Sequence, residues 1–159
     1  HFIGPIQSNK TRTIAEHFDW VHSVDRLKIA ERLSAQRPAG LPPLNVCLQV
    51  NISGEPSKAG CEPAELPALA LAVSQLPQLH LRGLMAIPAA TPDITRQHTA
   101  FAHLRELRDS LGLPLDCLSM GMSEDLEAAI AEGASWVRIG SAIFGARNYD
   151  APPTQGNVS

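Results

Sequence analysis

The sequence has few cysteines, few aromatic residues and no long apolar run. Its 159 residues include three cysteines, Cys47, Cys61 and Cys117, and 4% aromatic residues. An odd number of cysteines without paired spacing predicts free thiols in a reducing compartment rather than a disulfide framework. No apolar run approaches the roughly 20 residues of a membrane span, and no signal peptide is recognisable. We therefore expect a cytoplasmic protein with no membrane partner.

Clustered positive charge and metal-ligand spacing are also missing. The formal net charge is −3 and the Lys and Arg residues form no basic run. Binding to a phosphate backbone needs such a cluster, so we expect no nucleic-acid partner. The pairs His17/His22 and His98/His103 are five residues apart. A metal-binding pair on a helix needs a spacing of about four, so no metal site is predicted.

Short apolar strands alternate with helical segments along the whole chain. Strands are predicted at residues 1–4, 20–24, 45–52, 79–87, 116–120 and 136–139, and helices at 9–18, 25–35, 64–76, 93–110 and 124–132. Asp25 is expected to cap the second helix, and Pro67 fits the third only in its first turn. This alternation predicts a parallel sheet with covering helices.

The number of units indicates a partial barrel. A full (β/α)8 TIM barrel has eight strands and about 250 residues, so six units correspond to about strands 3 to 8. The first strand begins at the first residue, which suggests a piece of a longer protein. A complete doubly wound sheet is the alternative, but residues 4–10 do not match its Gly-rich fingerprint. We expect one α/β domain at residues 1–149 and a disordered tail at 150–159.

Two strand–turn–helix units at the end of the series are typical of a phosphate site. Residues 118–126 and 137–145 each run from an apolar strand through Gly and Ser into a helix. Helix N-termini attract phosphate, and barrels bind it after strands 7 and 8. We therefore predict that Ser123, Gly140 and Ser141 bind a phosphorylated ligand. Ser123 could instead be a plain helix cap, and Glu124 and Asp125 would repel a phosphate if they faced it.

Arg138 is the most informative single residue. Alternation along its strand places it on one face with Trp136 and Gly140. There it would bind a ligand near the strand end. In the alternative the faces are reversed and Arg138 pairs with a helix carboxylate such as Glu132, and spacing alone does not decide between the two.

Two further features could border a ligand. Asn45, Cys47, Gln49 and Asn51 share one strand face, which suits either a ligand mouth or a satisfied polar network in the core. His1 could border the site or be a buried structural histidine.

Five motifs together resemble the pyridoxal phosphate homeostasis protein family, the YggS-like and PROSC-like proteins. They are HFIGPIQSNK at 1–10, VNIS at 50–53, RGLMAIP at 82–88, LSMGMSED at 118–125 and VRIGSAIFGAR at 137–147. The resemblance covers residues 1 to about 149. It implies a barrel like the N-terminal domain of alanine racemase, with pyridoxal 5′-phosphate (PLP) as cofactor.

The resemblance also implies roles for particular residues. Ser123, Gly140 and Ser141 would hold the PLP phosphate, and Arg138 would approach the pyridine nitrogen. The family's Schiff-base lysine would lie on a strand before His1. The family carries the cofactor rather than turning over a substrate, so we expect no enzyme activity and no catalytic residues. Apo PLP-dependent enzymes are candidate partners. The alternatives are a PLP-dependent racemase and a phosphosugar-binding barrel enzyme without PLP.

Overall fold

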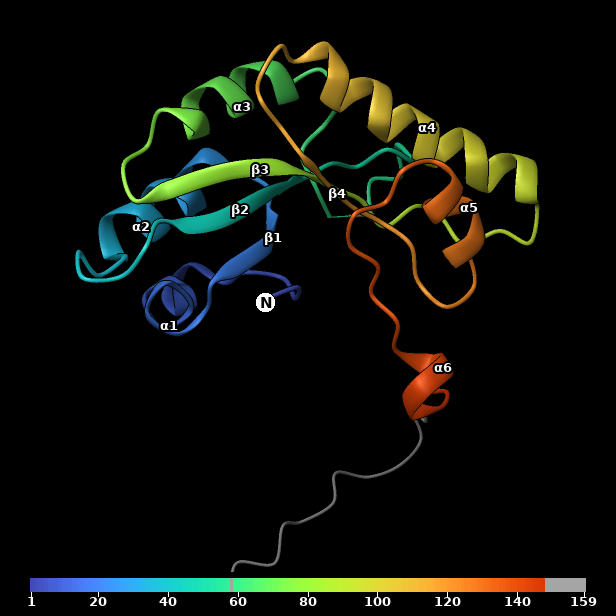
Figure 1. Cartoon of the computed structure of the whole chain (residues 1–159), viewed down its shortest axis with the longest axis horizontal. Coiled ribbons are helices and arrows are strands. Elements are labelled where there is room, and N and C mark those ends of the chain that lie inside the picture. The colour runs from blue at the N-terminus through green and yellow to red at the C-terminus, as the bar shows by residue number, and fades with distance from the viewer. Residues whose placement is uncertain (58, 148–159) are drawn as a thin grey trace, which may run out of the picture.

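Four parallel strands form the sheet of this protein. The computed structural model describes residues 1–57 and 59–147. The strand order is β1-β2-β3-β4, the same as the order in the chain (Figure 1). The strands are β1 (Trp20–Val24), β2 (Leu44–Gln49), β3 (Leu79–Met85) and β4 (Cys117–Ser119). The predicted parallel α/β architecture is therefore confirmed. The predicted tail at 150–159 and the domain end at 149 lie outside the described residues.

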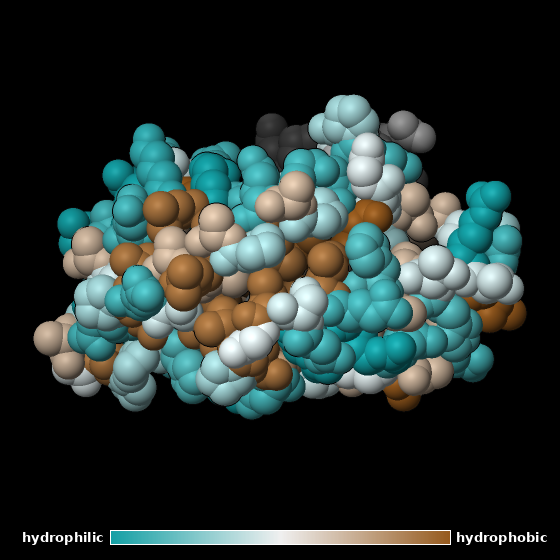
Figure 2. Space-filling model, turned by 90° about the horizontal axis from the view of Figure 1, so that it is seen from above, coloured by the Kyte–Doolittle hydropathy of each residue, from teal (hydrophilic) through white to brown (hydrophobic). Residues whose placement is uncertain are grey.

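Helices precede, connect and follow the four strands (Figure 1). They are η1 (Ser8–Lys10), α1 (Thr11–His17), α2 (Leu27–Gln36), α3 (Leu66–Ser74), α4 (Ile94–Ser110), α5 (Leu126–Ala131) and α6 (Ser141–Phe144). Pro67 lies in the first turn of α3, as predicted, where its missing N–H disrupts no helical bond. In the space-filling view, apolar residues gather near the middle of the visible face (Figure 2).

The outermost two of the six predicted strands are present only as isolated bridges. Phe2 bridges to Val21, and Trp136 bridges to Ser119, both in the parallel sense. The prediction of six full strands is wrong at these two places. Near the second bridge the chain turns at Gly121, whose φ is +99°. A Cβ on Gly121 would lie 2.5 Å from the Cβ of Ala129, so only glycine allows α5 to pack this close.

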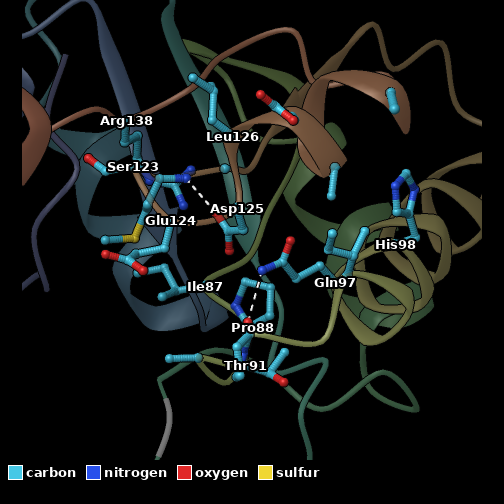
Figure 3. A pocket seen from close by; sticks show the side chains of 18 residues that line it. Ile87, Pro88, Thr91, Gln97, His98, Ser123, Glu124, Asp125, Leu126 and Arg138 are labelled. Carbon is cyan, nitrogen blue, oxygen red and sulfur yellow. Dashed lines mark hydrogen bonds between the residues drawn. The ribbon is translucent and has the colours of Figure 1, made fainter.

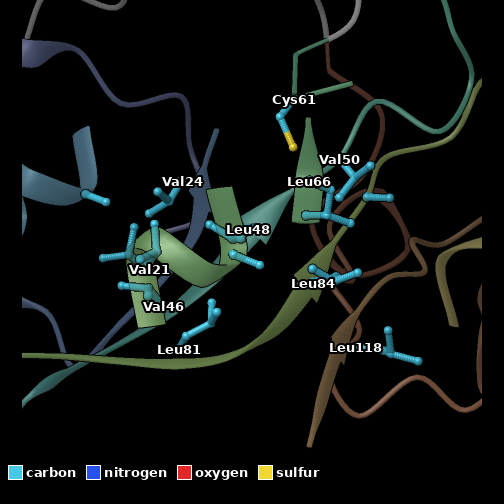
Figure 4. Packing of buried hydrophobic residues seen from close by; sticks show 14 of the residues in the cluster. Val21, Val24, Val46, Leu48, Val50, Cys61, Leu66, Leu81, Leu84 and Leu118 are labelled. Carbon is cyan, nitrogen blue, oxygen red and sulfur yellow. The ribbon is translucent and has the colours of Figure 1, made fainter. Parts of the chain in front are cut away.

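The main apolar core lies between the sheet and the helices. Val46, Leu48 and Val50 of the β2 region point into it, and they pack with Leu66 and Leu84 (Figure 4). This confirms the predicted division of residues 45–51 into an apolar face and a face of alternating polar residues. The other face carries a second, smaller cluster of Cys47, Met85 and Cys117, with Trp20 packed against it.

A row of three residues crosses the sheet on that second face. Cys47 pairs with Gly83 of β3, and Gly83 pairs with Cys117 of β4. A Cβ on Gly83 would lie only 1.8 Å from the carbonyl oxygen of Cys117. The close approach of β3 and β4 therefore depends on glycine at this position.

Candidate functional site

The two predicted phosphate loops meet at the carboxyl ends of the strands. The Ser123 hydroxyl, in the loop before α5, accepts a hydrogen bond of 3.2 Å from the N–H of Ala142 in α6. Gly140 is the N-cap residue of α6 and Ser141 is its first residue. Ser123, Gly140 and Ser141 are thus brought together, although they lie in two separate units of the chain.

Arg138 lies on the second face of the sheet, the inner face that carries Cys47, Met85 and Cys117. Two hydrogen bonds hold its side chain. Its Nη1 donates to Ser119 Oγ at 2.7 Å, and its Nη2 donates to the carbonyl oxygen of Ala86 at 2.9 Å. Burial lowers the pKa of its guanidinium from the usual high value. The alternative pairing of Arg138 with Glu132 is wrong, because the Glu132 carboxylate binds His98 at 2.8 Å and also Arg105.

A buried hydrogen-bond chain continues from Arg138 across the sheet. Ser119 Oγ lies 2.6 Å from Nδ1 of His22, and Nε2 of His22 lies 2.9 Å from Nδ1 of His1. Burial, together with the positive charge of Arg138, lowers the pKa of His22 to about 4. His22 is therefore neutral at physiological pH. One proton arrangement satisfies every pair: Arg138 donates to Ser119, Ser119 donates to His22, and His22 donates to His1.

Aromatic rings lie around His1, where this series of hydrogen bonds ends. The His1 ring stacks on Trp20 with centroids 5.3 Å apart, and Trp20 meets Trp136 edge-on at 5.5 Å. His1 is exposed and bordered by these rings, so its interpretation as a buried structural histidine is wrong. The inner face of the sheet thus combines a polar relay with stacked aromatic groups.

Of the two acidic residues next to Ser123, Asp125 is held by a hydrogen bond within its own loop. Asp125 Oδ1 accepts a hydrogen bond of 2.7 Å from the N–H of Met122, which turns this carboxylate back onto its own loop. Glu124 is exposed. The N-cap of α5 is Asp125, so Ser123 is not the plain helix cap of the alternative interpretation. The repulsion expected between Asp125 and a phosphate is therefore reduced by geometry.

A cavity of about 940 Å³ opens beside these residues. Ser123 and Arg138 border it from the loops after the strands, while Gln97 and His98 border it from α4 (Figure 3). The cavity lies at the carboxyl ends of β3 and β4, where β/α folds bind their ligands.

Sequence reasoning missed Ser119, His22 and the carbonyl of Ala86. Ser119 and His22 are polar residues inside short, otherwise apolar strands, and that signal could have identified them as members of a buried network. The carbonyl of Ala86 carries no signal, since every residue has one. Of the predicted polar face, Asn45 binds Arg82 and Cys47 contacts Cys117, so these two residues take part in contacts away from the serines.

Among residues 1–57 and 59–147, no group of three or more His, Cys, Asp or Glu side chains could hold a metal ion. In the same part of the chain, no helix has the length and apolar character needed to cross a bilayer. The three cysteines are free thiols, as predicted.

Close relatives share most of this sequence. The pyridoxal phosphate homeostasis protein of Pseudomonas aeruginosa is 76% identical over 152 residues, which cover 96% of this chain and 66% of the relative. The protein of that name from Escherichia coli K12 is 58% identical over 156 residues, covering 94% and 65%. The chain thus spans about two thirds of the length of these relatives.

Solved structures show the same fold. PipY of Synechococcus elongatus without PLP is 44% identical with a TM-score of 0.81, covering 89% of this chain and 68% of PipY. PipY with PLP bound is 42% identical with a TM-score of 0.80 and the same coverage. An alanine racemase of Clostridium difficile is 15% identical with a TM-score of 0.69, covering 92% and 39%, and this likeness concerns the fold alone.

The family comparison agrees with the observed sheet. The model of the alanine racemase N-terminal domain matches residues 1–148. The parallel sheet and its outer helices form part of the barrel that was predicted for this chain. The chain therefore belongs to the family of the alanine racemase N-terminal domain.

Proposed function

We propose that this chain binds PLP and that it belongs to a protein of intracellular PLP homeostasis. The observation that carries the proposal is the 76% identity to a relative named pyridoxal phosphate homeostasis protein. The PLP-bound structure of PipY, 42% identical, adds support. In this proposal Ser123, Gly140 and Ser141 hold the phosphate, and Arg138 faces the pyridine nitrogen.

The arrangement of these residues fits such a ligand. A phosphate needs hydroxyl and N–H donors from more than one direction, and the contact between Ser123 and Ala142 joins two loops that supply them. The carboxylate of Asp125, two residues after Ser123, is already bound to the N–H of Met122. In the described residues the Ser141 hydroxyl forms no hydrogen bond with the protein, so it is free to bind an oxygen of the ligand.

The anchoring of Arg138 would make bound PLP a weaker electron sink. When bound, PLP supplies an electron-withdrawing ring, and that ring is strongest when its nitrogen is protonated. Arg138 keeps its own proton, since it is an arginine anchored by Ser119 and Ala86. It therefore donates a hydrogen bond to the nitrogen without protonating it. We propose that the protein is not an enzyme, that it is cytoplasmic and that apo PLP-dependent enzymes receive its cofactor.

The phosphate site is tested by Ser141→Asp. The new carboxylate would face the phosphate dianion, so we expect PLP binding to weaken by about 1–3 kcal/mol. Binding is measured in the chain by quenching of tryptophan fluorescence as PLP is added. Ser110→Asp, at the exposed end of α4, is the matched control and should bind like the parent. Equal affinity in Ser141→Asp and the parent would place the phosphate elsewhere.

The mode of attachment is a separate prediction. Lys10 lies in η1 and Lys28 lies in α2, and both are exposed. Lys58 lies outside the described residues. Exposed, mobile amines are poorly positioned for a specific bond. We expect weak, non-covalent binding, so borohydride reduction followed by peptide mass mapping should find only trace labelling. A single stoichiometric phosphopyridoxyl-lysine would contradict this expectation.

The two alternative functions are tested by two different measurements. A racemase would convert added L-alanine to the D form in the presence of PLP, as followed by chiral chromatography. A phosphosugar-binding enzyme would bind a sugar phosphate such as ribose 5-phosphate more tightly than PLP. We expect no racemisation and tighter binding of PLP.

A further inference from the structure

Two cysteines from different strands meet on the inner face of the sheet. The Sγ atoms of Cys47 in β2 and Cys117 in β4 are 3.6 Å apart. Both side chains are buried, with exposed fractions of 0% and 2%. Strand β3 lies between them, but its residue in that row is Gly83. Because Gly83 has no side chain, the two thiols reach each other across β3.

The separation of the strands does not suit a disulfide. Neighbouring strands lie about 4.8 Å apart, so the Cα atoms of residues two strands apart are separated by roughly 9–10 Å. A disulfide requires less than about 7 Å between its Cα atoms. Oxidation of Cys47 and Cys117 to a disulfide would therefore require movement of the backbone. An atom bound between the two sulfurs would require a much smaller adjustment.

Other groups around the pair favour such an atom. Met85, which is fully buried, belongs to the same cluster and adds a thioether sulfur, and Trp20 packs against it. The guanidinium of Arg82 lies 4.7 Å from the centroid of the Trp20 ring, and it donates two hydrogen bonds to the carboxylate of Asp116, the residue before Cys117.

We propose that Cys47, Cys117 and Met85 form a binding site for a soft monovalent cation, Cu(I). Sulfur-only donors select soft ions, whereas Zn²⁺ prefers four ligands and commonly includes histidine or carboxylate. With metal–sulfur bonds of about 2.3 Å, the distance of 3.6 Å corresponds to an S–metal–S angle of about 100°. A trigonal site needs roughly 4.0 Å, so the sulfurs separate by a few tenths of an ångström on binding.

The binding step balances without a redox change. One Cu(I) ion replaces the protons of two thiols, so two protons are released and a dithiolate complex of charge −1 forms. Strand β4 has only three residues and lies at the edge of the ladder, so it can shift slightly. This site is independent of PLP binding.

The test is an anaerobic titration of the reduced chain with Cu(I) in competition with bicinchoninate. We expect one tightly bound ion per chain and tighter binding at higher pH. Cys47→Ser and Cys117→Ser should each weaken binding at least tenfold, and Met85→Leu should weaken it severalfold. Cys61→Ser is the matched control, because Cys61 is also buried but lies in the main core, and it should bind like the parent.

A second measurement does not depend on the variants folding correctly. X-ray absorption of the Cu(I)-loaded parent chain should show only sulfur neighbours, at about 2.3 Å. Nitrogen or oxygen neighbours would overturn the proposal. The same holds if the parent fails to compete with bicinchoninate, or if folded Cys47→Ser, Cys117→Ser or Met85→Leu binds Cu(I) as tightly as the parent.

Discussion

His22 is the residue on which the buried polar network depends. It lies between Ser119 and His1: its Nδ1 accepts a hydrogen bond from Ser119, and its Nε2 donates one to His1. A protonated ring would place a second positive charge near the buried guanidinium of Arg138. Burial and this repulsion therefore favour the neutral form of His22. The surroundings of Arg138 therefore depend on pH through His22, which is not among the residues predicted to bind the ligand.

The stability of the folded chain should fall in mildly acidic solution. In the unfolded chain His22 gains a proton near its ordinary pKa of 6.5, but in the folded chain it does so only at about 4. The unfolded state thus binds more protons between these values, and stability is lost as the pH falls through this window. We expect a loss of roughly 2 kcal/mol, allowing for solvent screening, as measured by urea unfolding at several pH values.

The contribution of His22 is isolated by two variants. His22→Asn should remove most of the slope of unfolding free energy against pH between 6.5 and 4. His103→Asn, at an exposed position on α4, should keep that slope. An unchanged slope in His22→Asn would show that His22 titrates normally.

At the scale of elements, the pairing of β3 with β4 depends on Gly83. The ladder between them has only three residue pairs, and Gly83 provides the first. Because a side chain here would overlap the Cys117 carbonyl, the two strands cannot pair without glycine. β4 carries Ser119, so displacement of this strand would also loosen Arg138.

Gly83→Ala should therefore be strongly destabilising. We expect a loss of about 3 kcal/mol from overpacking against the backbone, measured by chemical denaturation. Gly40→Ala is the control, since a Cβ at Gly40 meets nothing within 4 Å, and it should change stability little. Similar stability of Gly83→Ala and Gly40→Ala would mean that β4 moves away freely.

The sequence predicted the elements well where a local signal decides them. β1 was predicted at the residues where it is observed, because its apolar run is bounded by turns. Asp93 does begin α4: its carboxylate accepts hydrogen bonds from the N–H groups of Thr95 and Arg96. Asp25 was expected to cap α2 in the same way, but its carboxylate binds the guanidinium of Arg26 instead. A competing ion pair of this kind cannot be seen in residue type and spacing.

The candidate site was predictable only in part. The positions of Ser123, Gly140 and Ser141 followed from the glycine and serine that end each strand, although their role in binding stays a prediction. The partners of Arg138 did not follow, because Ser119 and Ala86 come from other strands and meet it only through strand register. The same holds for the contact of Cys47 with Cys117, which depends on a glycine between them.

For the molecule as a whole, several exposed apolar side chains lie in the last described segment. Trp136, Val137, Ile143 and Phe144 have exposed fractions of 40%, 38%, 68% and 85%. The four-residue helix α6, red in Figure 1, lies away from the sheet. Exposed apolar groups promote association.

We expect the chain to self-associate in solution. Sedimentation velocity at micromolar concentration should show species larger than the monomer of 17.1 kDa. Replacing both Ile143 and Phe144 by Ser should shift the distribution towards monomer. Ile94→Ser is the control, because Ile94 is 67% exposed on α4 but lies outside this segment, and it should leave the distribution unchanged. A sharp monomeric boundary for the parent chain would contradict the expectation.

The order of the strands in the sheet has a consequence for how the chain folds as it is synthesised. Each strand pairs with the one that precedes it in the sequence, so its partner has already left the ribosome when it emerges. Ribosomes add roughly 5–20 residues per second, whereas loops close far faster, so each βα unit has time to dock on the last. The described sheet can thus grow one strand at a time in the order of synthesis, and β4 is the last of the four strands to be added.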